Sequence, residues 1–416
     1  MVQHKHLSQA WVTILVASLG YFVDIFDLQL FNIVSKKSLE GIGITDPNLL
    51  ATYDYSLFLW QMSGMIIGGV LWGIMGDTKG RRSILFGSIL LYSLANIANA
   101  FVTNVHQYEW IRLLAGLGLA GELGAAITLV NEIMQKENRG YGTMVIVTMG
   151  ALGAVAAAFF NDMDWSIFGL AHWQMMYLIG GGLGLTLLFL RMGTHESQMF
   201  HHVKGEGQIK RGDFLMLFRS KERFLRYLAC IGLGIPVWYS VGLLIKFSKD
   251  FVQHNGGDLE HFNFAHAIMY TYIGLSIGDL FSALLSQLLK SRKKVVLGYI
   301  VVHAIVVFTF IFMTNLSAQS YYILCFLIGG STGYWALFVT IAAETFGTNI
   351  RATVTTTVPN FVRGATIPIV LGFKAIEPIL GFHQSALILG IISLLIAFIS
   401  LAYIKESFGR DLHFTE

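Results

Sequence analysis

Charge is what this sequence has least of: Asp, Glu, Lys and Arg supply 13% of its 416 residues, whereas hydrophobic residues supply 55%. A soluble domain carries about 25% charged residues. The scarcity therefore excludes a soluble globular protein and predicts an integral membrane protein that contacts the lipid bilayer. The formal net charge of +3 is small, and we expect no nucleic-acid partner.

Cysteine is also scarce, and the residue groups of common catalytic and metal sites are missing. The two cysteines, Cys230 and Cys325, both lie in apolar runs, which predicts buried thiols without a disulfide. The sequence contains no nucleotide-binding loop, no catalytic triad and no zinc motif. We therefore expect no catalytic residue, no metal ion and no cofactor.

Long apolar runs, by contrast, are abundant. Twelve of them reach about 20 residues or more, the length that a helix needs to cross a hydrocarbon core of about 30 Å. A backbone in lipid must satisfy its hydrogen bonds internally, so each run is expected to be helical. The expected spans are residues 10–34, 52–77, 82–102, 107–134, 140–161, 172–193, 223–250, 263–290, 294–315, 319–345, 351–375 and 382–405.

Basic residues gather in every second connection between these spans. Arg81 and Arg82 follow the second span, and Lys293 and Lys294 follow the eighth, while the intervening connections are less basic. Because basic loops stay on the cytoplasmic side, both termini are expected to be cytoplasmic. The short loops favour a bacterial inner membrane.

A polar, charged segment divides the spans into two sets of six. We expect an N-terminal six-helix bundle at residues 1–193, a cytoplasmic linker at 194–222 and a C-terminal six-helix bundle at 223–416. Internal duplication of this kind is usual in secondary transporters.

The connection after the second span carries the most specific motif. It reads GIMGDTKGRR, with Gly73, Asp77, Gly80, Arg81 and Arg82. This spacing resembles the G-x-x-x-D-x-x-G-R-R signature of the major facilitator superfamily. The resemblance implies an all-α membrane protein with twelve transmembrane helices in two pseudo-symmetric six-helix bundles. The corresponding loop of the second half, SALLSQLLKSRKK, has neither the Gly nor the Asp.

Three further segments narrow the resemblance. GLAGELG in span four is similar to the G-G-E-W-G stretch of metabolite and sialate proton symporters. VDIFDLQLF in span one resembles the D-G-[FY]-D segment of aromatic-acid and sialate symporters, with Ile25 in place of the Gly. ETFGTNIRATVTTTVPNFVRG resembles the E-x-F-P-T-x-x-R-x-T run of the same branch, which includes organic-ion transporters, with Gly347 in place of Pro.

Matching charges mark the ends of spans four and ten. Glu132 and Arg139 are seven residues apart, and Glu344 and Arg351 repeat that spacing. Ion pairs there form only when the helix ends approach, so we expect a cytoplasmic latch that stabilises an outward-facing state. The expected gating residues are Gly73, Asp77, Arg81, Arg82, Glu132, Arg139, Glu344 and Arg351.

Acids inside the spans point to proton coupling. Asp24 and Asp27 lie one helical turn apart in span one, and a charge at mid-membrane costs about 2.5–3.5 kcal/mol on insertion scales. In proton-coupled sugar porters of the superfamily, an Asp in span one pairs with an Arg in span four, which implies that Asp27 pairs with Arg112 and carries the proton. A structural ion pair is the alternative. Asp24 either shares the proton or bonds to a neighbouring helix, and Glu122 is either a protonated helix contact or a second proton site.

Arg363 indicates an anionic substrate. It lies inside span eleven, with no acid one helical turn away on its own helix. A guanidinium in a partly dehydrated cavity binds a carboxylate through two hydrogen bonds, and anion transporters of the resembling branch tend to carry Arg at about this place. An Arg that reaches a carbonyl or the membrane surface is the alternative. Aromatic residues expected in the cavity are Trp238, Tyr270, Tyr334 and Trp335.

Together these features predict a monomeric secondary active transporter and no enzyme. Its partners would be protons and a small organic anion, a carboxylate metabolite taken up by alternating access. The alternatives are a proton-coupled sugar or amino-acid porter and a drug/proton antiporter. A membrane prenyl-transfer enzyme is a remote alternative, because D-x-x-D in a membrane helix resembles one half of the paired acidic motifs that such enzymes need.

Overall fold

The computed structural model describes residues 2–134, 139–163, 169–191, 211–412 and 414–416. The first half of the chain forms α1 to α7, and the second half forms α9 to α17 with two short segments, η2 and η3. The helices of the first half are α1 (Val2–Gly41), α2 (Pro47–Lys79), α3 (Arg81–Asn99), α4 (Val105–Leu119), α5 (Glu122–Ile133), α6 (Arg139–Asn161) and α7 (His172–Leu190).

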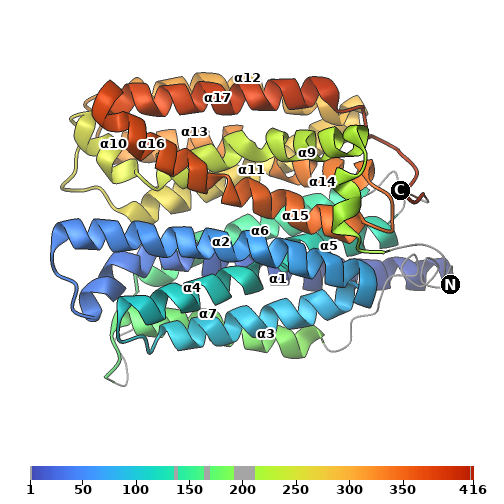
Figure 1. Cartoon of the computed structure of the whole chain (residues 1–416), viewed down its shortest axis with the longest axis horizontal. Coiled ribbons are helices and arrows are strands. Elements are labelled where there is room, and N and C mark those ends of the chain that lie inside the picture. Colours follow the sequence, from blue (N-terminus) through green and yellow to red (C-terminus); the bar gives the residue numbers. More distant parts are fainter. Residues whose placement is uncertain (1, 135–138, 164–168, 192–210, 413) are drawn as a thin grey trace.

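The second half repeats this pattern with more interruptions. It contains η2 (Phe214–Phe218), α9 (Lys221–Tyr239), η3 (Ser240–Ile245), α10 (Ser248–His254), α11 (Phe264–Leu289), α12 (Arg292–Phe312), α13 (Ala318–Ser331), α14 (Trp335–Thr345), α15 (Arg351–Gly364), α16 (Thr366–Leu380) and α17 (Phe382–Tyr403). In Figure 1 the helices run side by side along the horizontal axis, with the first half below and the second half above.

Ten stretches of the described chain are long and apolar enough to cross a membrane. The other two expected spans are α3 and the pair α15–α16, which brings the count to the predicted twelve. The sequence of α15 is RATVTTTVPNFVRG, and its threonines and asparagine lower its hydropathy. Nearly all its residues are buried, because it packs between α2, α5 and α9, so it needs little apolar surface toward lipid.

Four spans are broken rather than continuous. Breaks between α4 and α5 and between α13 and α14 fall at the same position in the two halves, near Gly121 and Gly333. Span seven changes from α-helix to a π-helical segment at Ser240, and span eleven breaks at Ala365. Broken spans are frequent where transporter helices line a substrate path.

The two halves meet along closely packed helices, α2 with α15 and α6 with α11. Glycine permits the closest approach: a Cβ added to Gly73 would lie 2.9 Å from the Thr353 Cα.

Both cysteines are buried and free, as expected. Most of the predicted linker, residues 194–210, lies outside the described residues. Its described remainder contains η2 and the first two residues of α9, Lys221 and Glu222.

Candidate functional site

A small cavity lies between the two halves near the middle of the helices. Its volume is about 20 Å³, enough for about one water molecule. The described conformation is therefore closed around its centre. The cavity is lined from α1 and α6 on one side and from α9, η3, α11, α14 and α15 on the other, by Tyr21, Ile25, Val147, Ala151, Val237, Trp238, Val241, Tyr272, Leu275, Trp335 and Arg363.

Arg363 brings the charge to this cavity. Its side chain is fully buried, and its guanidinium donates to the Asn360 side chain at 3.4 Å and to the Tyr21 hydroxyl at 3.3 Å. The guanidinium carbon lies 5.7 Å from the ring centre of Trp238 and 6.0 Å from that of Trp335. A permanently charged group is thus held by one aromatic hydroxyl, one amide and two indole rings.

Asp24 supplies the nearest acid, from the opposite half. Its Oδ2 lies 3.8 Å from Nη2 of Arg363, which is close enough for charge attraction but too long for a hydrogen bond. Both carboxylate oxygens are buried and have no hydrogen-bond donor among the described residues. The geometry therefore brings together a residue predicted for proton coupling and a residue predicted for substrate binding.

The predicted pair of Asp27 and Arg112 is wrong for this conformation. No hydrogen bond or ion pair within the described ranges involves either side chain, although both are fully buried. Arg112 lies over the ring of Phe31 at 4.2 Å, and Asp27 faces Gly180 of α7, where an added Cβ would approach its Oδ1 to 2.2 Å. Neither lines the central cavity, because both point into the first bundle.

Glu122 has a partner that the sequence interpretation missed. It accepts hydrogen bonds from both terminal nitrogens of Arg191, one of them at 2.9 Å, and both side chains are buried. Arg191 also donates to the Val16 carbonyl of α1 at 3.2 Å. Glu122 is thus an ion-paired acceptor that joins α5 to the end of α7, and not the protonated donor that was one of the two expectations.

The predicted aromatic residues divide into two groups. Trp238 and Trp335 line the cavity, with ring centres 6.5 Å apart. Tyr270 and Tyr334 do not, so this part of the expectation is wrong. Tyr270 stacks on the ring of Tyr322 at 5.3 Å, and Tyr334 donates to the carbonyl of Leu233 at 3.0 Å.

Two tyrosines complete the cavity wall. Tyr21 accepts from the indole N–H of Trp335 at 3.2 Å, and the Tyr272 hydroxyl accepts from the Gln29 side chain at 2.7 Å. Both bonds cross between the halves. Tyr21 lies three residues before Asp24, and that spacing on one helical face is the signal that could have identified it.

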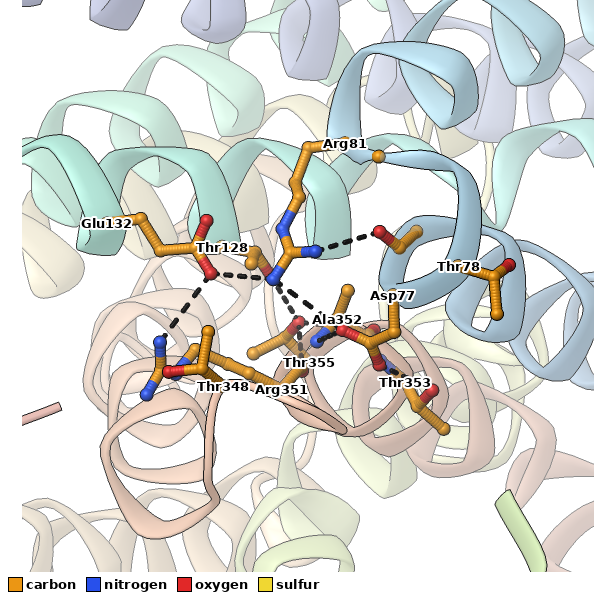
Figure 2. Close-up of polar contacts among 12 residues, drawn as sticks. Asp77, Thr78, Arg81, Thr128, Glu132, Thr348, Arg351, Ala352, Thr353 and Thr355 are labelled. Atoms are coloured by element: carbon orange, nitrogen blue, oxygen red, sulfur yellow. Dashed lines mark hydrogen bonds and ion pairs between the residues drawn. The ribbon is translucent and has the colours of Figure 1, made fainter. Parts of the chain in front are cut away.

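At one end of the helices, the gating residues of the first half bind the start of α15. Asp77 accepts from the backbone N–H groups of Ala352 at 3.0 Å and Thr353 at 2.8 Å, and from the Thr353 hydroxyl at 2.7 Å. The first N–H groups of a helix lack intrahelical acceptors and attract an anion. This one carboxylate thus ties α2 to the N-terminus of α15, as Figure 2 shows.

Glu132 of α5 contacts two arginines, one in its own half and one across the two halves. It lies 2.6 Å from Arg81 of α3 and 3.5 Å from Arg351 of α15. Arg81 also lies 3.6 Å from Asp77, so Figure 2 shows one connected network of charges. We call the residues Asp77, Arg81, Glu132, Arg351 and Thr353 the latch, and the end of the helices that carries them the latch end.

The remaining gating residues lie near the latch but have other partners. Glu344 lies 3.3 Å from Arg292 and accepts from the Ser407 hydroxyl at 2.7 Å, so the Glu344–Arg351 repeat does not form an ion pair. Arg139 donates to the carbonyl of Arg410 at 3.2 Å. Arg82 is exposed, and its guanidinium lies 5.3 Å from the ring centre of Phe86.

The opposite end has a wider opening, a vestibule of about 460 Å³. At its base Lys246 of the second half lies 3.0 Å from Asp54 of α2 in the first half, and it donates to Asn32 of α1 at 3.5 Å. Asp54 also accepts from the Ser35 hydroxyl. We call this the vestibule end.

A second small cavity, of about 10 Å³, lies between the vestibule and the centre. It shares Trp238, Val241 and Tyr272 with the central cavity and Asn32 and Lys246 with the vestibule. These shared walls form a row of cavities from the vestibule to Arg363, and the latch lies at the opposite end of the helices.

Several known transport proteins are similar to this chain in sequence. A Haemophilus influenzae protein assigned to metabolite transport is 25% identical over 98% of this chain and 99% of its own length. The sialic acid transporter NanX of Escherichia coli is 26% identical over 60% of this chain and 58% of its own. The 4-hydroxybenzoate transporter PcaK of Pseudomonas putida is 27% identical over 48% of this chain and 43% of its own.

Solved structures match the fold at lower identity. The proton:xylose symporter XylE bound to 6-bromo-6-deoxy-D-glucose superposes with a TM-score of 0.75, at 15% identity and 98% coverage of both chains. The sequence profile of the Major Facilitator Superfamily matches residues 17–369. The predicted fold is therefore confirmed, and the enzyme alternative is excluded. This chain is a multi-pass membrane transporter of the Major Facilitator Superfamily.

Proposed function

We propose that this protein imports a small organic anion together with protons, by alternating access across a bacterial inner membrane. The observation that carries the proposal is Arg363, a fully buried cation on the wall of the central cavity. Buried charges need compensation, and its nearest acid, Asp24, is 3.8 Å away. A substrate carboxylate offers the bidentate partner that the protein itself does not provide.

Asp24 is our candidate for the proton site. A substrate carboxylate on Arg363 would compete with Asp24 for the same positive charge, so substrate binding favours the protonated, neutral form of Asp24. Protonation in turn frees Arg363 for the substrate. Each ligand therefore increases the affinity for the other, as cotransport requires. In this scheme Asp27 and Arg112 are a secondary charge pair that meets only in another conformation.

The latch and the pair of Asp54 and Lys246 are proposed to be the two gates. Closing the latch joins α2 and α5 to α15, while closing the vestibule joins α2 to span seven. Alternating access requires that one gate open while the other stays closed. The distribution of basic residues supports a cytoplasmic latch end, with both termini inside. The two bundles, 1–193 and 223–416, would rock about the cavity as a monomer.

Names of relatives favour an anionic substrate, since NanX is a sialic acid transporter and PcaK a 4-hydroxybenzoate transporter. The test is uptake by purified protein in liposomes, with an inwardly directed proton gradient and a panel of sialic acid, 4-hydroxybenzoate, nicotinate, xylose and alanine. Accumulation of a carboxylate only with the gradient supports the proposal. Accumulation of xylose or alanine, but of no carboxylate, supports the neutral-solute alternative. Solute efflux driven by the gradient supports a drug antiporter.

A further inference from the structure

An apolar groove runs along the outside of the second half, where α11, α12 and α13 meet. Its volume is about 500 Å³, far more than that of the central cavity. Leu285 and Leu289 of α11, Val302 of α12 and Leu327 of α13 are among the side chains that line it, and all four are exposed. These helices belong to the membrane-spanning set, so the groove opens toward lipid and not toward the substrate path.

Two glycines create this groove. Gly298 of α12 has no heavy atom within 4 Å of the place that a Cβ would occupy, and the nearest atom at Gly330 of α13 is 3.8 Å away. Because glycine has no side chain, these two positions leave a hollow between α12 and α13. In membrane proteins a neighbouring helix usually packs closely against such small residues. The groove depends on these two positions rather than on a loop.

The groove spans one leaflet of a bilayer. Lys294 and Val306, at its two ends, are twelve residues apart on α12, which is about 18 Å along a helix. Half of a hydrocarbon core measures about 15 Å. The polar wall residue Ser331 is satisfied, because its hydroxyl donates to the Ile328 carbonyl at 2.9 Å and bonds to His303 at 2.8 Å. A hydrocarbon chain matches such a surface in length and polarity.

The end of the groove nearest the latch end is basic. Lys290 and Lys294 are exposed, and within the described ranges neither has an acid within 4 Å or another polar partner. The nearby acid Glu406 is engaged elsewhere, since it accepts from the Ser291 hydroxyl and from the N–H of Arg292 at 2.9 Å. Two ammonium groups at the edge of a membrane favour the phosphate of an anionic lipid.

We propose that this groove is a binding site for one anionic phospholipid. An acyl chain lies along Gly298 and Gly330, and the lipid phosphate binds at Lys290 and Lys294. The inference does not depend on the identity of the transported solute, since the groove and the substrate cavity share no lining residue.

Native mass spectrometry of the full chain tests the site. Purified protein is mixed with dioleoylphosphatidylglycerol or dioleoylphosphatidylcholine, and bound lipid is counted over a concentration series. We expect one tightly retained phosphatidylglycerol and no equally retained phosphatidylcholine. The double variant Lys290→Ala/Lys294→Ala should bind phosphatidylglycerol about 30-fold more weakly, since each lysine near a membrane surface contributes about fivefold.

A groove-filling variant separates the acyl-chain site from a general effect of charge. Gly298→Leu should abolish the retained lipid, whereas Gly182→Leu on α7, which also faces open space, should not. The thermal unfolding temperature of each variant confirms folding. Equal retention of the two lipids by the unmodified protein would overturn the proposal. Unchanged retention in either the lysine variant or Gly298→Leu would do the same.

Discussion

Asp24 of α1 and Arg363 of α15 face each other across the two halves of the protein, with 3.8 Å between the nearest carboxylate oxygen and guanidinium nitrogen. They belong to different bundles, so any rocking of one bundle against the other changes their separation. Within the described residues the Asp24 carboxylate accepts no hydrogen bond, whereas Arg363 is held by Tyr21 and Asn360. Under the proposed function, charge, substrate and conformation would therefore meet at this contact.

Replacing Asp24 tests the coupling role. Asp24→Asn should abolish accumulation of the solute driven by a proton gradient, but it should leave exchange of labelled for unlabelled solute within a few-fold of normal, because exchange moves no net proton. Asp27→Asn is the matched variant, one turn along the same helix, and should retain at least part of the accumulation. If Asp24→Asn still concentrates solute and Asp27→Asn does not, the proton site is Asp27.

Weakening the latch should open its end of the protein. Asp77→Asn removes the charge from three hydrogen bonds to the start of α15, each worth about 1.5–3 kcal/mol with a charged acceptor. Loss of about 2 kcal/mol shifts the conformational equilibrium about 30-fold. The readout is thiol labelling at Thr128→Cys, beside the latch, after both native cysteines are replaced by Ala.

The partly exposed acid Asp258 provides the control for the latch experiment. It lies in a loop at the vestibule end, and Asp258→Asn should leave the labelling rate at Thr128→Cys unchanged. Unchanged labelling in Asp77→Asn as well would show that the latch does not hold this end closed.

The vestibule pair should act in the opposite direction. Asp54→Asn breaks the ion pair with Lys246, so a membrane-impermeant thiol reagent should reach Ile268→Cys, on the wall of the small cavity, several-fold faster. Exchanging the charges, with Asp54→Lys and Lys246→Asp together, should restore slow labelling. Fast labelling in the exchanged variant would mean that the pair does not close the path.

The buried pair of Glu122 and Arg191 should contribute to stability rather than to coupling. Arg191→Ala leaves an uncompensated buried carboxylate and should cost about 3–5 kcal/mol. The double variant Glu122→Gln/Arg191→Met should be less destabilised, because no charge is left without a partner. Thermal unfolding in detergent measures both. Proton-driven uptake lost in a well-folded double variant would instead indicate a second proton site.

The fold was accessible from the sequence because apolar length and the GIMGDTKGRR spacing are local features. The breaks in spans four and ten could not be predicted from the sequence, since nothing in the residues around Gly121 and Gly333 contradicts a continuous helix. Asp77 and Arg81 were assigned to a latch from their motif, but their partners on α15 depend on how the halves dock.

The candidate site was predicted as separate residues and not as a constellation. Arg363 was singled out because a permanent charge inside a span needs compensation. That Asp24, and not Asp27, lies nearest to it depends on the rotation of α1, which one helical turn of sequence does not determine. Asp54 and Arg191 were overlooked, because a charge near the end of a span resembles an ordinary interfacial residue.

The most direct test of the account is the affinity of Arg363 variants for a carboxylate and its uncharged analogue. Purified protein would be titrated with acid and amide pairs, namely 4-hydroxybenzoate with 4-hydroxybenzamide and nicotinate with nicotinamide, and also with sialic acid. The decisive titration is the one with the carboxylate that the uptake panel identifies as the substrate. We expect the carboxylate to bind well, its amide poorly, and Arg363→Ala to weaken carboxylate binding about 100-fold or more, since two charge-assisted hydrogen bonds are lost. Arg363→Lys should fall between, and Arg219→Ala, at an exposed arginine away from the cavity, should bind normally. Equal affinity of Arg363→Ala and the unmodified protein, or equal binding of acid and amide, would contradict the claim that Arg363 holds an anionic substrate.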